Sequence, residues 1–357
     1  MNLYQRFTSS NDIFYYRNIT ANPIINQSES WTFIEEYFRL GGKEKSFDLK
    51  WFKNLKENGK HIHAISMYFL GCILQDIIKN NLDIEMANFI PGEKDFNKDF
   101  LYLWFLTCLY HDTAYVIEND KLSINFANSS DYLKYYLNDN KIKHDVYSRK
   151  WLGKSHYTYE RELIENYFNY RIEKWKCVDH GIIGGFLFYD RLYENYNNAW
   201  NKYRKNNEDN NITKDRFEYK GLIWDKHQLD VFAYISNAII AHNVYYSDNE
   251  KLYNKYGLKK LIKSNDNKII LKSDPLLYFL SIVDTIEPTK FFDNKTPEDI
   301  WKNIDMYFDY SLNCITIKSL SDEFYTKEWE NKIVSLKDWL AIDVTPESNR
   351  TIYIKIT

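Results

Sequence analysis

The sequence has 357 residues, of which 44% are hydrophobic and 27% are charged, a composition typical of a globular protein with a large core. The formal net charge of −3 gives no electrostatic argument for a nucleic-acid or membrane partner, although a local basic groove for nucleic acid remains compatible with it. No run of about 18 apolar residues occurs, and the polar segment 1–10 lacks the basic and apolar regions of a signal peptide. We therefore expect a cytoplasmic protein without a membrane span.

Apolar residues with helical spacing predict five helices, and the scarcity of glycine (11) and proline (6) favours long ones. Pro275 suits the first turn of the last predicted helix, and Pro288 suits its end. The predicted helices cover residues 61–79, 100–118, 179–196, 230–242 and 274–287.

We expect a mainly α fold with three parts. Residues 1–59 form an N-terminal helical extension, and residues 60–292 form the main helical domain. That domain carries insertions at about 119–176 and 197–226, and the polar stretch around the second insertion (194–226) predicts a flexible loop. Residues 293–357 form a small α/β appendage, with short β-like runs at 314–317 and 350–357 on either side of an amphipathic helix.

Six ionisable residues interrupt or terminate the predicted apolar helices. A single histidine in such a place is usually a hydrogen-bonded core residue, and a single aspartate is usually a cap or an ion-pair partner. Six such groups on five helices favour a shared site, because burying ionisable groups is costly unless they are paired or bound to metal. Imidazole and carboxylate groups are ligands for divalent transition metals, which helical bundles hold in their interior. The six residues are His63, His111, Asp112, His180, His242 and Asp284.

The order of these residues resembles that of the HD-domain superfamily of metal-dependent phosphohydrolases. The resemblance extends to the local sequences HAISMYFLG, LYHDTAY, DHGIIGG, AIIAHN and SIVDTIEP, and it covers about residues 60–290. It implies a one-metal ligand set of His63, His111, Asp112 and Asp284, to which two-metal members add His180 and His242. Asp112 would then bridge both metals. His61 is an alternative first ligand, but the sequence around His63 resembles the family more closely.

The resemblance implies one or two divalent transition metals (Fe, Mn, Ni, Co or Zn, with Mg also compatible). It further implies hydrolysis of a nucleotide or another phosphate ester by a metal-bound hydroxide. Asp112 and Asp179 would be the catalytic residues, with Asp179 orienting His180; capping of the following helix is the alternative role for Asp179. Candidate substrate-binding residues are Lys154, Arg191 and Lys290 for an anionic group and Tyr115 for stacking or hydrogen bonding.

Three other functions are compatible with the same ligand order: an HD-type nuclease, a di-iron HD oxygenase and a non-catalytic HD binding module. One departure from the family argues against a cyclic dinucleotide as the substrate. Enzymes of this superfamily that cleave cyclic dinucleotides typically have Gly-Lys soon after the His-Asp pair and a Gly-Tyr-Pro motif, whereas this chain continues from Asp112 with Thr113, Ala114 and Tyr115 and contains no Gly-Tyr-Pro. The sequence makes no prediction of the oligomeric state.

Overall fold

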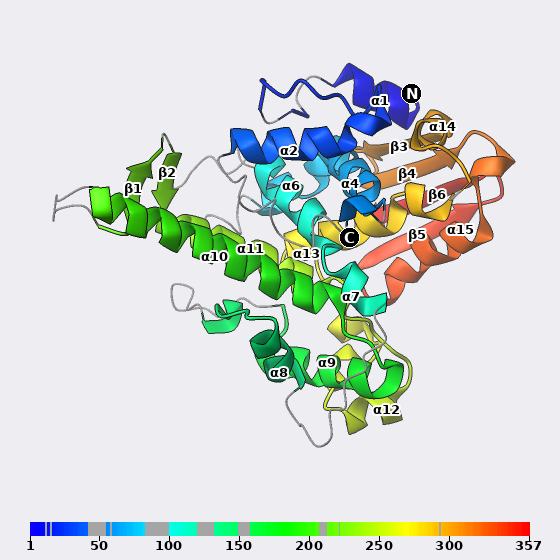
Figure 1. Ribbon diagram of the computed structural model, residues 1–357. Helices are drawn as coiled ribbons and strands as arrows, with labels where there is room; N and C mark the ends of the chain where they lie inside the picture. The colour runs from blue at the N-terminus through cyan, green and yellow to red at the C-terminus, as the bar shows by residue number, and fades with distance from the viewer. Residues whose placement is uncertain are drawn as a thin grey trace.

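The computed structural model shows a mainly helical protein with a small antiparallel sheet near the C-terminus (Figure 1), as the sequence predicts. Within the described part of the chain, no helix is long and apolar enough to cross a membrane. The structure describes residues 1–10, 13–14, 16–41, 55–57, 59–82, 100–119, 132–148, 158–206, 213–220, 222–292 and 294–357.

Five helices of the central body confirm the helices predicted from apolar periodicity. The side chains of the second are almost all buried, as its uniformly apolar sequence indicates. Pro275 is the first residue of the last one, where its missing N–H leaves no helical hydrogen bond unmade. The five are α4 (Lys60–Leu74), α6 (Phe100–His111), α10 (His180–Asn206), α11 (Lys226–Ala241) and α13 (Pro275–Ile286).

The helix predicted over 100–118 is interrupted in the middle. α6 ends at His111, a turn covers Asp112–Ala114, and α7 (Tyr115–Asn119) follows. This break frees Asp112 from the regular helical backbone and places it at the end of a largely buried helix.

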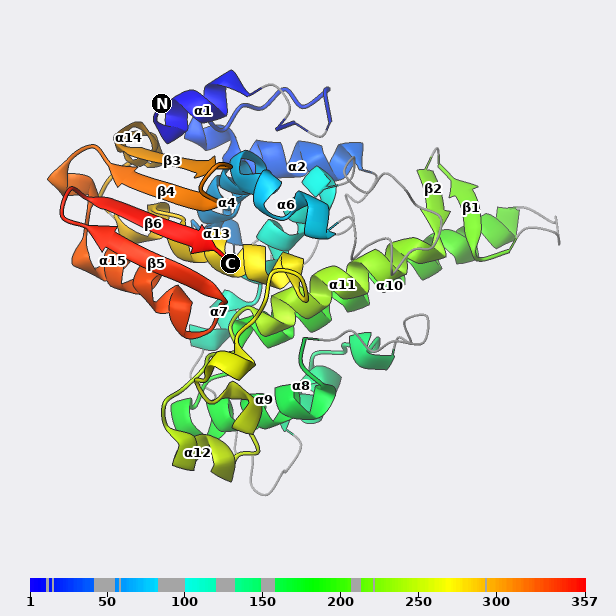
Figure 2. The same ribbon diagram turned by 180° about the vertical axis from the view of Figure 1, so that it is seen from behind.

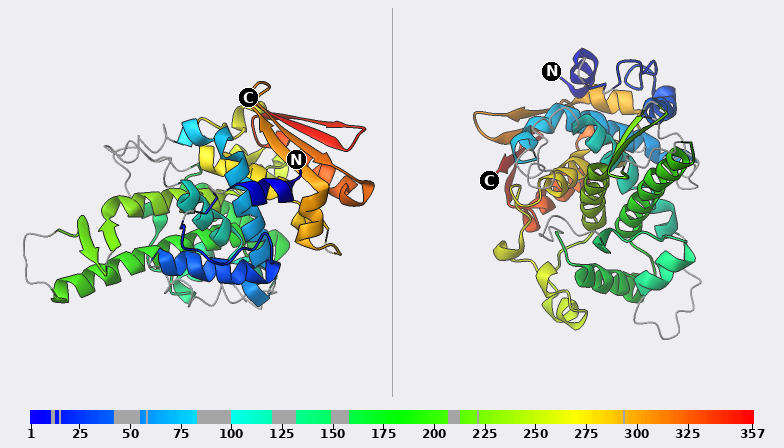
Figure 3. Two further views of the ribbon diagram at one scale, coloured as in Figure 1. Left: turned by 90° about the horizontal axis from the view of Figure 1, so that it is seen from above. Right: turned by 90° about the vertical axis from the view of Figure 1, so that its left-hand side faces the viewer.

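The prediction of a flexible loop over 194–226 is wrong for most of that segment. α10 continues to Asn206, and a hairpin of β1 (Arg216–Tyr219) and β2 (Leu222–Asp225) follows. The physical reason is aromatic packing: the rings of Trp200 and Phe217 lie 5.1 Å apart, and Phe217 stacks on Trp224 at 6.3 Å. The hairpin and the end of α10 extend away from the rest of the molecule (Figures 1 and 3).

Further helices surround the central body. α1 (Leu3–Ser9) and α2 (Ser30–Leu40) both contact α4. α8 (Tyr132–Asp139) and α9 (Arg161–Trp175) contact each other on the opposite side of the molecule, together with α12 (Glu250–Lys255) (Figures 1 and 2). Short 3₁₀ turns occur at Gln27–Glu29, Gln75–Ile77, Val146–Ser148, Lys259–Leu261, Asn265–Asn267, Thr289–Phe291, Asp322–Phe324 and Ser335–Asp338.

The C-terminal part is a four-stranded antiparallel sheet in the order β3-β4-β6-β5, with α14 (Pro297–Asn303) before it and α15 (Lys327–Val334) packed against β5. The strands are β3 (Ile304–Asp309), β4 (Cys314–Ser319), β5 (Ile342–Glu347) and β6 (Thr351–Ile356).

The sequence predicts the central strands β4 and β6 and the helix α15 but misses β3 and β5. Both missed strands lie at the edges of the sheet, where one side makes no ladder and charged residues or proline are tolerated. β5 contains Pro346 and Glu347, which weaken its strand pattern in the sequence.

Candidate metal centre

The six predicted ligands converge from five helices. His63 lies on α4, His111 ends α6, His180 begins α10, and His242 directly follows α11. Two groups of residues can each hold a metal ion, because the ligand atoms within each group all lie within 4.8 Å of one another. Asp112 belongs to both groups. The first group contains His63, His111 and Asp112, and the second contains Asp112, His180 and His242.

Asp284, on α13, completes the first group. Its Oδ1 atom lies 3.2 Å from Nε2 of His63 and 3.8 Å from Nε2 of His111. Asp112 lies between the two groups, with Oδ1 3.3 Å from Nε2 of His180 and 3.6 Å from Nε2 of His111, and Oδ2 3.9 Å from Nε2 of His63. The Nε2 atoms of His63, His111 and His180 therefore face the two carboxylates.

Backbone carbonyls orient two of the imidazoles. The Nδ1 atom of His111 lies 2.7 Å from the carbonyl oxygen of Cys108, and that of His242 lies 2.6 Å from the carbonyl oxygen of Ile239. A carbonyl oxygen can only accept, so Nδ1 carries the proton in both rings. The lone pair is then on Nε2, the atom available to a metal ion.

Carboxylates, that of Glu287 buried and that of Glu118 partly buried, orient the other two imidazoles. The Nδ1 atom of His63 lies 2.7 Å from Oε2 of Glu287, and Nδ1 of His180 contacts Oε2 of Glu118. Glu118 in turn forms an ion pair with the buried guanidinium of Arg171. A carboxylate on the far nitrogen of a metal-binding histidine fixes the ring and increases its basicity.

The sequence analysis misses both of these glutamates. Glu287 is completely buried and also accepts a hydrogen bond from Ser66 Oγ at 2.6 Å and one from the Thr289 backbone N–H at 3.0 Å. Glu287 could be recognised in the sequence as a carboxylate at the end of an apolar helix, directly before Pro288. Glu118 lies on the short helix α7, which the sequence does not separate from α6.

An unpartnered buried atom supports metal binding at this centre. Nε2 of His111 is inaccessible to solvent and has no hydrogen-bond partner. Buried polar atoms in proteins are almost always satisfied, so such an atom calls for a partner. Four imidazoles and two carboxylates are a suitable donor set for divalent transition ions, and the residues therefore fit one or two of them.

Without metal, the carboxylates hold protons on two of the imidazoles. Burial lowers the pKa of His63, but hydrogen bonds with Asp284 and Glu287 outweigh it and raise the pKa to about 9. Burial likewise opposes the charge on His180, and hydrogen bonds with Asp112 and Glu118 raise its pKa to about 10.

The other two imidazoles are driven toward the neutral form. Burial, followed by repulsion from His111 and His180, lowers the pKa of His242 to about 4. Burial also lowers the pKa of His111. Burial raises the pKa of Asp112, but His111 and His180 outweigh it and hold that pKa well below its usual value. The centre thus has ionised carboxylates and two neutral imidazoles ready to act as ligands at neutral pH.

A cavity of about 460 Å³ opens onto the centre, and three lysines line it: Lys60, Lys290 and Lys332. Lys290 Nζ donates to Asp284 Oδ1 at 2.8 Å. Lys60 Nζ lies 3.6 Å from Asp112 Oδ2 and 4.0 Å from the centroid of the Tyr115 ring. The structure therefore places the predicted substrate-binding residues Lys290 and Tyr115 at the cavity, together with two lysines that the sequence analysis misses.

Asp179, predicted to be catalytic, lies behind the centre. It is completely buried, and its Oδ1 accepts a hydrogen bond from the Ile182 backbone N–H at 2.9 Å, the geometry of a helix cap. Its Oδ2 accepts a hydrogen bond from Asn243 at 3.0 Å, and Glu118 rather than Asp179 contacts Nδ1 of His180. Asp179 therefore caps α10, the alternative role considered for it.

The structure does not bring Arg191 to the cavity. Its guanidinium lies 3.0 Å from Glu194, beside a third group of possible ligands formed by His144, Asp190 and Glu194. Asp190 in that group accepts two backbone hydrogen bonds from the segment before α9, and Arg191 already balances Glu194.

Two further predictions are placed as follows. Lys154 lies outside the described residues. The ring of His61 faces the carbonyl oxygen of Leu55 at 3.4 Å, so His63 rather than His61 faces the metal centre.

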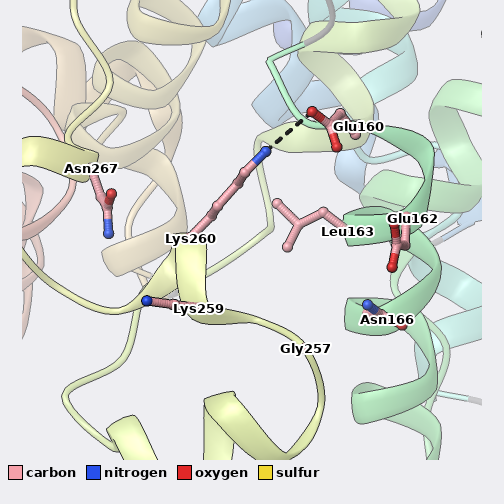
Figure 4. A pocket seen from close by; sticks show the side chains of 8 residues that line it. All are labelled: Glu160, Glu162, Leu163, Asn166, Gly257, Lys259, Lys260 and Asn267. Carbon is pink, nitrogen blue, oxygen red and sulfur yellow. Dashed lines mark hydrogen bonds and ion pairs between the residues drawn. The ribbon is translucent and has the colours of Figure 1, made fainter.

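A second cavity of about 420 Å³ lies between α9 and residues 257–267 (Figure 4). Lys260 Nζ spans it to Glu160 at 3.2 Å. The residues that line it include no histidine or cysteine, so the metal-binding geometry belongs to the first cavity.

No family model matches this chain, and no curated protein or solved structure matches it.

Proposed function

We propose that this protein is a metal-dependent phosphohydrolase of the HD superfamily, with two divalent ions held around Asp112. The observation that carries the proposal is the pair of His/Asp groups that share this carboxylate, with all four imidazoles oriented through Nδ1. A hydrogen-bonded core without a ligand would not require six convergent groups and an unpartnered Nε2 atom.

The donor set divides between two positions. His63, His111 and Asp284 would hold one ion, His180 and His242 would hold the other, and Asp112 would bridge them. Ions bound there would act as Lewis acids and lower the pKa of coordinated water, so that no serine or cysteine nucleophile is required.

The charges around the cavity favour an anionic substrate. Two divalent ions would bring four positive charges, and the three lysines of the cavity wall add to them, against the negative charges of Asp112, Asp284 and Glu328. Lys60 and Lys290 face the carboxylates of Asp112 and Asp284. Once the carboxylates bind metal, both ammonium groups become available to a phosphate, for which lysine is a common ligand.

A di-iron oxygenase could use the same six ligands; the three lysines favour an anionic substrate such as a phosphate ester, and an assay must separate the two reactions. The test is turnover of a panel of phosphate esters by protein loaded separately with Mn, Fe, Co, Ni or Mg, run in oxygen-18-labelled water with and without dissolved oxygen. We expect label in the released phosphate or alcohol, turnover without oxygen, and activity with redox-inactive ions.

Turnover that requires both iron and oxygen would instead establish an oxygenase. Cleavage restricted to single-stranded nucleic acid would establish a nuclease, and tight substrate binding without turnover would establish a binding module.

A further inference from the structure

The C-terminal unit, residues 294–357, forms part of the wall of the metal-centre cavity. Glu328 and Lys332 of α15, and Ser335 and Trp339 just after it, line the cavity together with the metal-binding residues. Figures 1 and 2 both show α15 beside α13, the helix that carries Asp284, and the two helices are in contact. α15 and the segment that follows it are therefore positioned to affect what enters the site.

Aromatic packing fixes α15 against the segment that follows the last metal ligand. Trp329 is completely buried, and its ring lies 5.8 Å from the ring of Phe292 and 6.5 Å from that of Phe291. Phe291 directly follows Lys290, so the helix and the lysine beside Asp284 belong to one packed cluster.

The backbone on both sides of Trp339 is also fixed to the helical body. The Ile269 N–H donates to the Trp339 carbonyl at 2.8 Å, and the Ala341 N–H donates to the Ile269 carbonyl at 2.9 Å. Asp338 forms an ion pair with Lys263 at 3.0 Å, and Tyr278 Oη donates to the Ala341 carbonyl at 3.0 Å. Three hydrogen bonds and an ion pair therefore fix the backbone on both sides of the half-buried Trp339, as recognition requires.

Lys332 differs from the other two lysines of the cavity. Lys60 and Lys290 each face a metal-binding carboxylate, whereas no carboxylate of the described residues lies within 4.0 Å of Lys332 Nζ. Its ammonium group lies 5.5 Å from the centroid of the Tyr245 ring. Lys332 is exposed to solvent, and partial burial followed by repulsion from Lys290 lowers its pKa, while attraction by Asp284 opposes this shift. An anionic group would relieve this repulsion.

The cavity is also too large for a phosphate alone. Its volume of about 460 Å³ lies in the range of pockets that hold a whole small molecule. Beyond the lysines, the aromatic residues Tyr245, Phe291 and Trp339 line it. A ligand that fills the cavity would therefore present an anionic part to the ions and lysines and a flat apolar part to the rings.

We propose that Lys332 and Trp339 of the C-terminal unit determine substrate specificity, Lys332 by binding a second anionic group and Trp339 by stacking on a flat ring of the same substrate. This inference rests on the proposed phosphohydrolase function, because it assigns the first anionic group to the metal centre. It makes α15 and the segment that follows it a part of the substrate site.

The test is calorimetric binding of three non-hydrolysable probes to the full chain in the presence of Mn²⁺. Methylphosphonate carries one anionic group, methylenediphosphonate carries two, and adenosine 5′-(α,β-methylene)diphosphate carries two anionic groups and a flat ring. Each variant is compared with the wild type on the same probe, so that chelation of Mn²⁺ by the probe cancels.

We expect Trp339→Ala to weaken only the adenosine probe, by about 10-fold, because stacking of one base contributes on the order of 1–3 kcal/mol. Lys332→Ala should weaken both two-anion probes by about 10-fold and leave methylphosphonate unchanged. Trp339→Phe, which keeps a ring, and Lys337→Ala, which removes an exposed lysine of the same unit outside the cavity wall, should bind all three probes like the wild type.

Unchanged binding of methylphosphonate shows that a variant retains the folded site. The inference is overturned if the wild type binds none of the probes, if the adenosine probe binds no more tightly than methylenediphosphonate, or if both variants match the wild type. Turnover is a separate measurement: hydrolysis with no difference between the probes refutes only this inference, whereas graded probe binding without hydrolysis of any phosphate ester refutes the hydrolase.

Discussion

Asp112 is the residue on which both halves of the candidate centre depend. Its two oxygens face imidazoles of both ligand groups, and its pKa is held well below the usual range by His111 and His180 although burial opposes the charge. A buried carboxylate in this position attracts cations, and Lys60 lies 3.6 Å from it. This geometry supports the bridging role that we propose for Asp112.

Substitution of Asp112 is therefore expected to affect both metal positions. Asp112→Ala should lower bound metal from two ions per chain toward zero and reduce turnover by more than about 100-fold, beyond the effect of losing an outer-shell partner. Metal content by elemental analysis and kcat on the best phosphate ester measure these effects. His227→Gln, at the first turn of α11 and outside the cavity wall, is the control and should change neither. Two ions retained in Asp112→Ala would refute the bridge.

Glu287 gives a second prediction at the same scale. It does not line the cavity but holds Nδ1 of His63, so it is a positioning residue. Glu287→Gln keeps the size of the side chain and removes its charge, which should weaken metal binding by 10–100-fold. The measurement is Mn²⁺ affinity by calorimetry, with exposed Glu347→Gln on β5 as the control. An affinity equal to that of the wild type would show that the backbone alone orients the ring of His63.

Helix packing determines whether these residues meet. α10 and α11 run side by side (Figures 1 and 2), and glycines of α10 permit their close approach. A Cβ atom on Gly185 would lie 2.5 Å from Ile240 Cγ1 and 2.8 Å from the Ser236 carbonyl oxygen. At Gly181 the same atom would lie 2.8 Å from Cε1 of His242. The glycines next to His180 thus allow the His242 ring to reach the centre.

Gly181→Ala tests this contact between elements. Alanine is the better helix former by about 1 kcal/mol, so propensity alone predicts a more stable protein. The steric contact predicts instead that the His242 ring is displaced and that bound metal falls from two ions per chain to one, with the ion at His63 and His111 retained. Ala199→Gly on the same helix is the control for propensity, and it should lower the melting temperature without changing the metal count. Two bound ions in Gly181→Ala would refute the role of this glycine.

The sequence predicts the elements of this molecule better than their long-range contacts. Buried helices are visible because every turn of α6 is apolar, whereas the edge strands β3 and β5 lack a clear pattern. The six ligands could be found because each is an ionisable group in an apolar helix. Lys332 could not be found, since it is one of several exposed lysines and only the packing of α15 places it at the cavity wall. Its role depends on the tertiary structure alone.

At the scale of the whole molecule, metal binding and stability are coupled through the protons that the ions must displace. In the metal-free protein the pKa of His63 is raised from 6.5 to about 9 and that of His180 from 6.5 to about 10. A pKa raised by folding stabilises the folded state fully below about pH 6.5, and this stabilisation is lost as the pH rises through 9 and 10. The pKa of His242 is lowered to about 4, so its neutral ring stabilises the folded state above about pH 6.5. This stabilisation is lost as the pH falls from 6.5 toward 4.

The final prediction concerns the metal-induced increase in melting temperature, which should grow from pH 6.5 to pH 9. Over this range the metal-free protein loses the stabilisation from the two protonated imidazoles, while metal binding strengthens because fewer protons compete for the same nitrogens. A ligand that binds only the folded state at 100 times its Kd adds about 2.7 kcal/mol of stability, so the shift is measurable. The measurement is thermal unfolding with and without Mn²⁺ across this pH range. Calorimetry in two buffers of different ionisation enthalpy should also detect protons released at pH 7. In His180→Gln the release should fall by about one proton. A metal-induced shift that is constant or shrinks with pH would show that these imidazoles do not bind the ions.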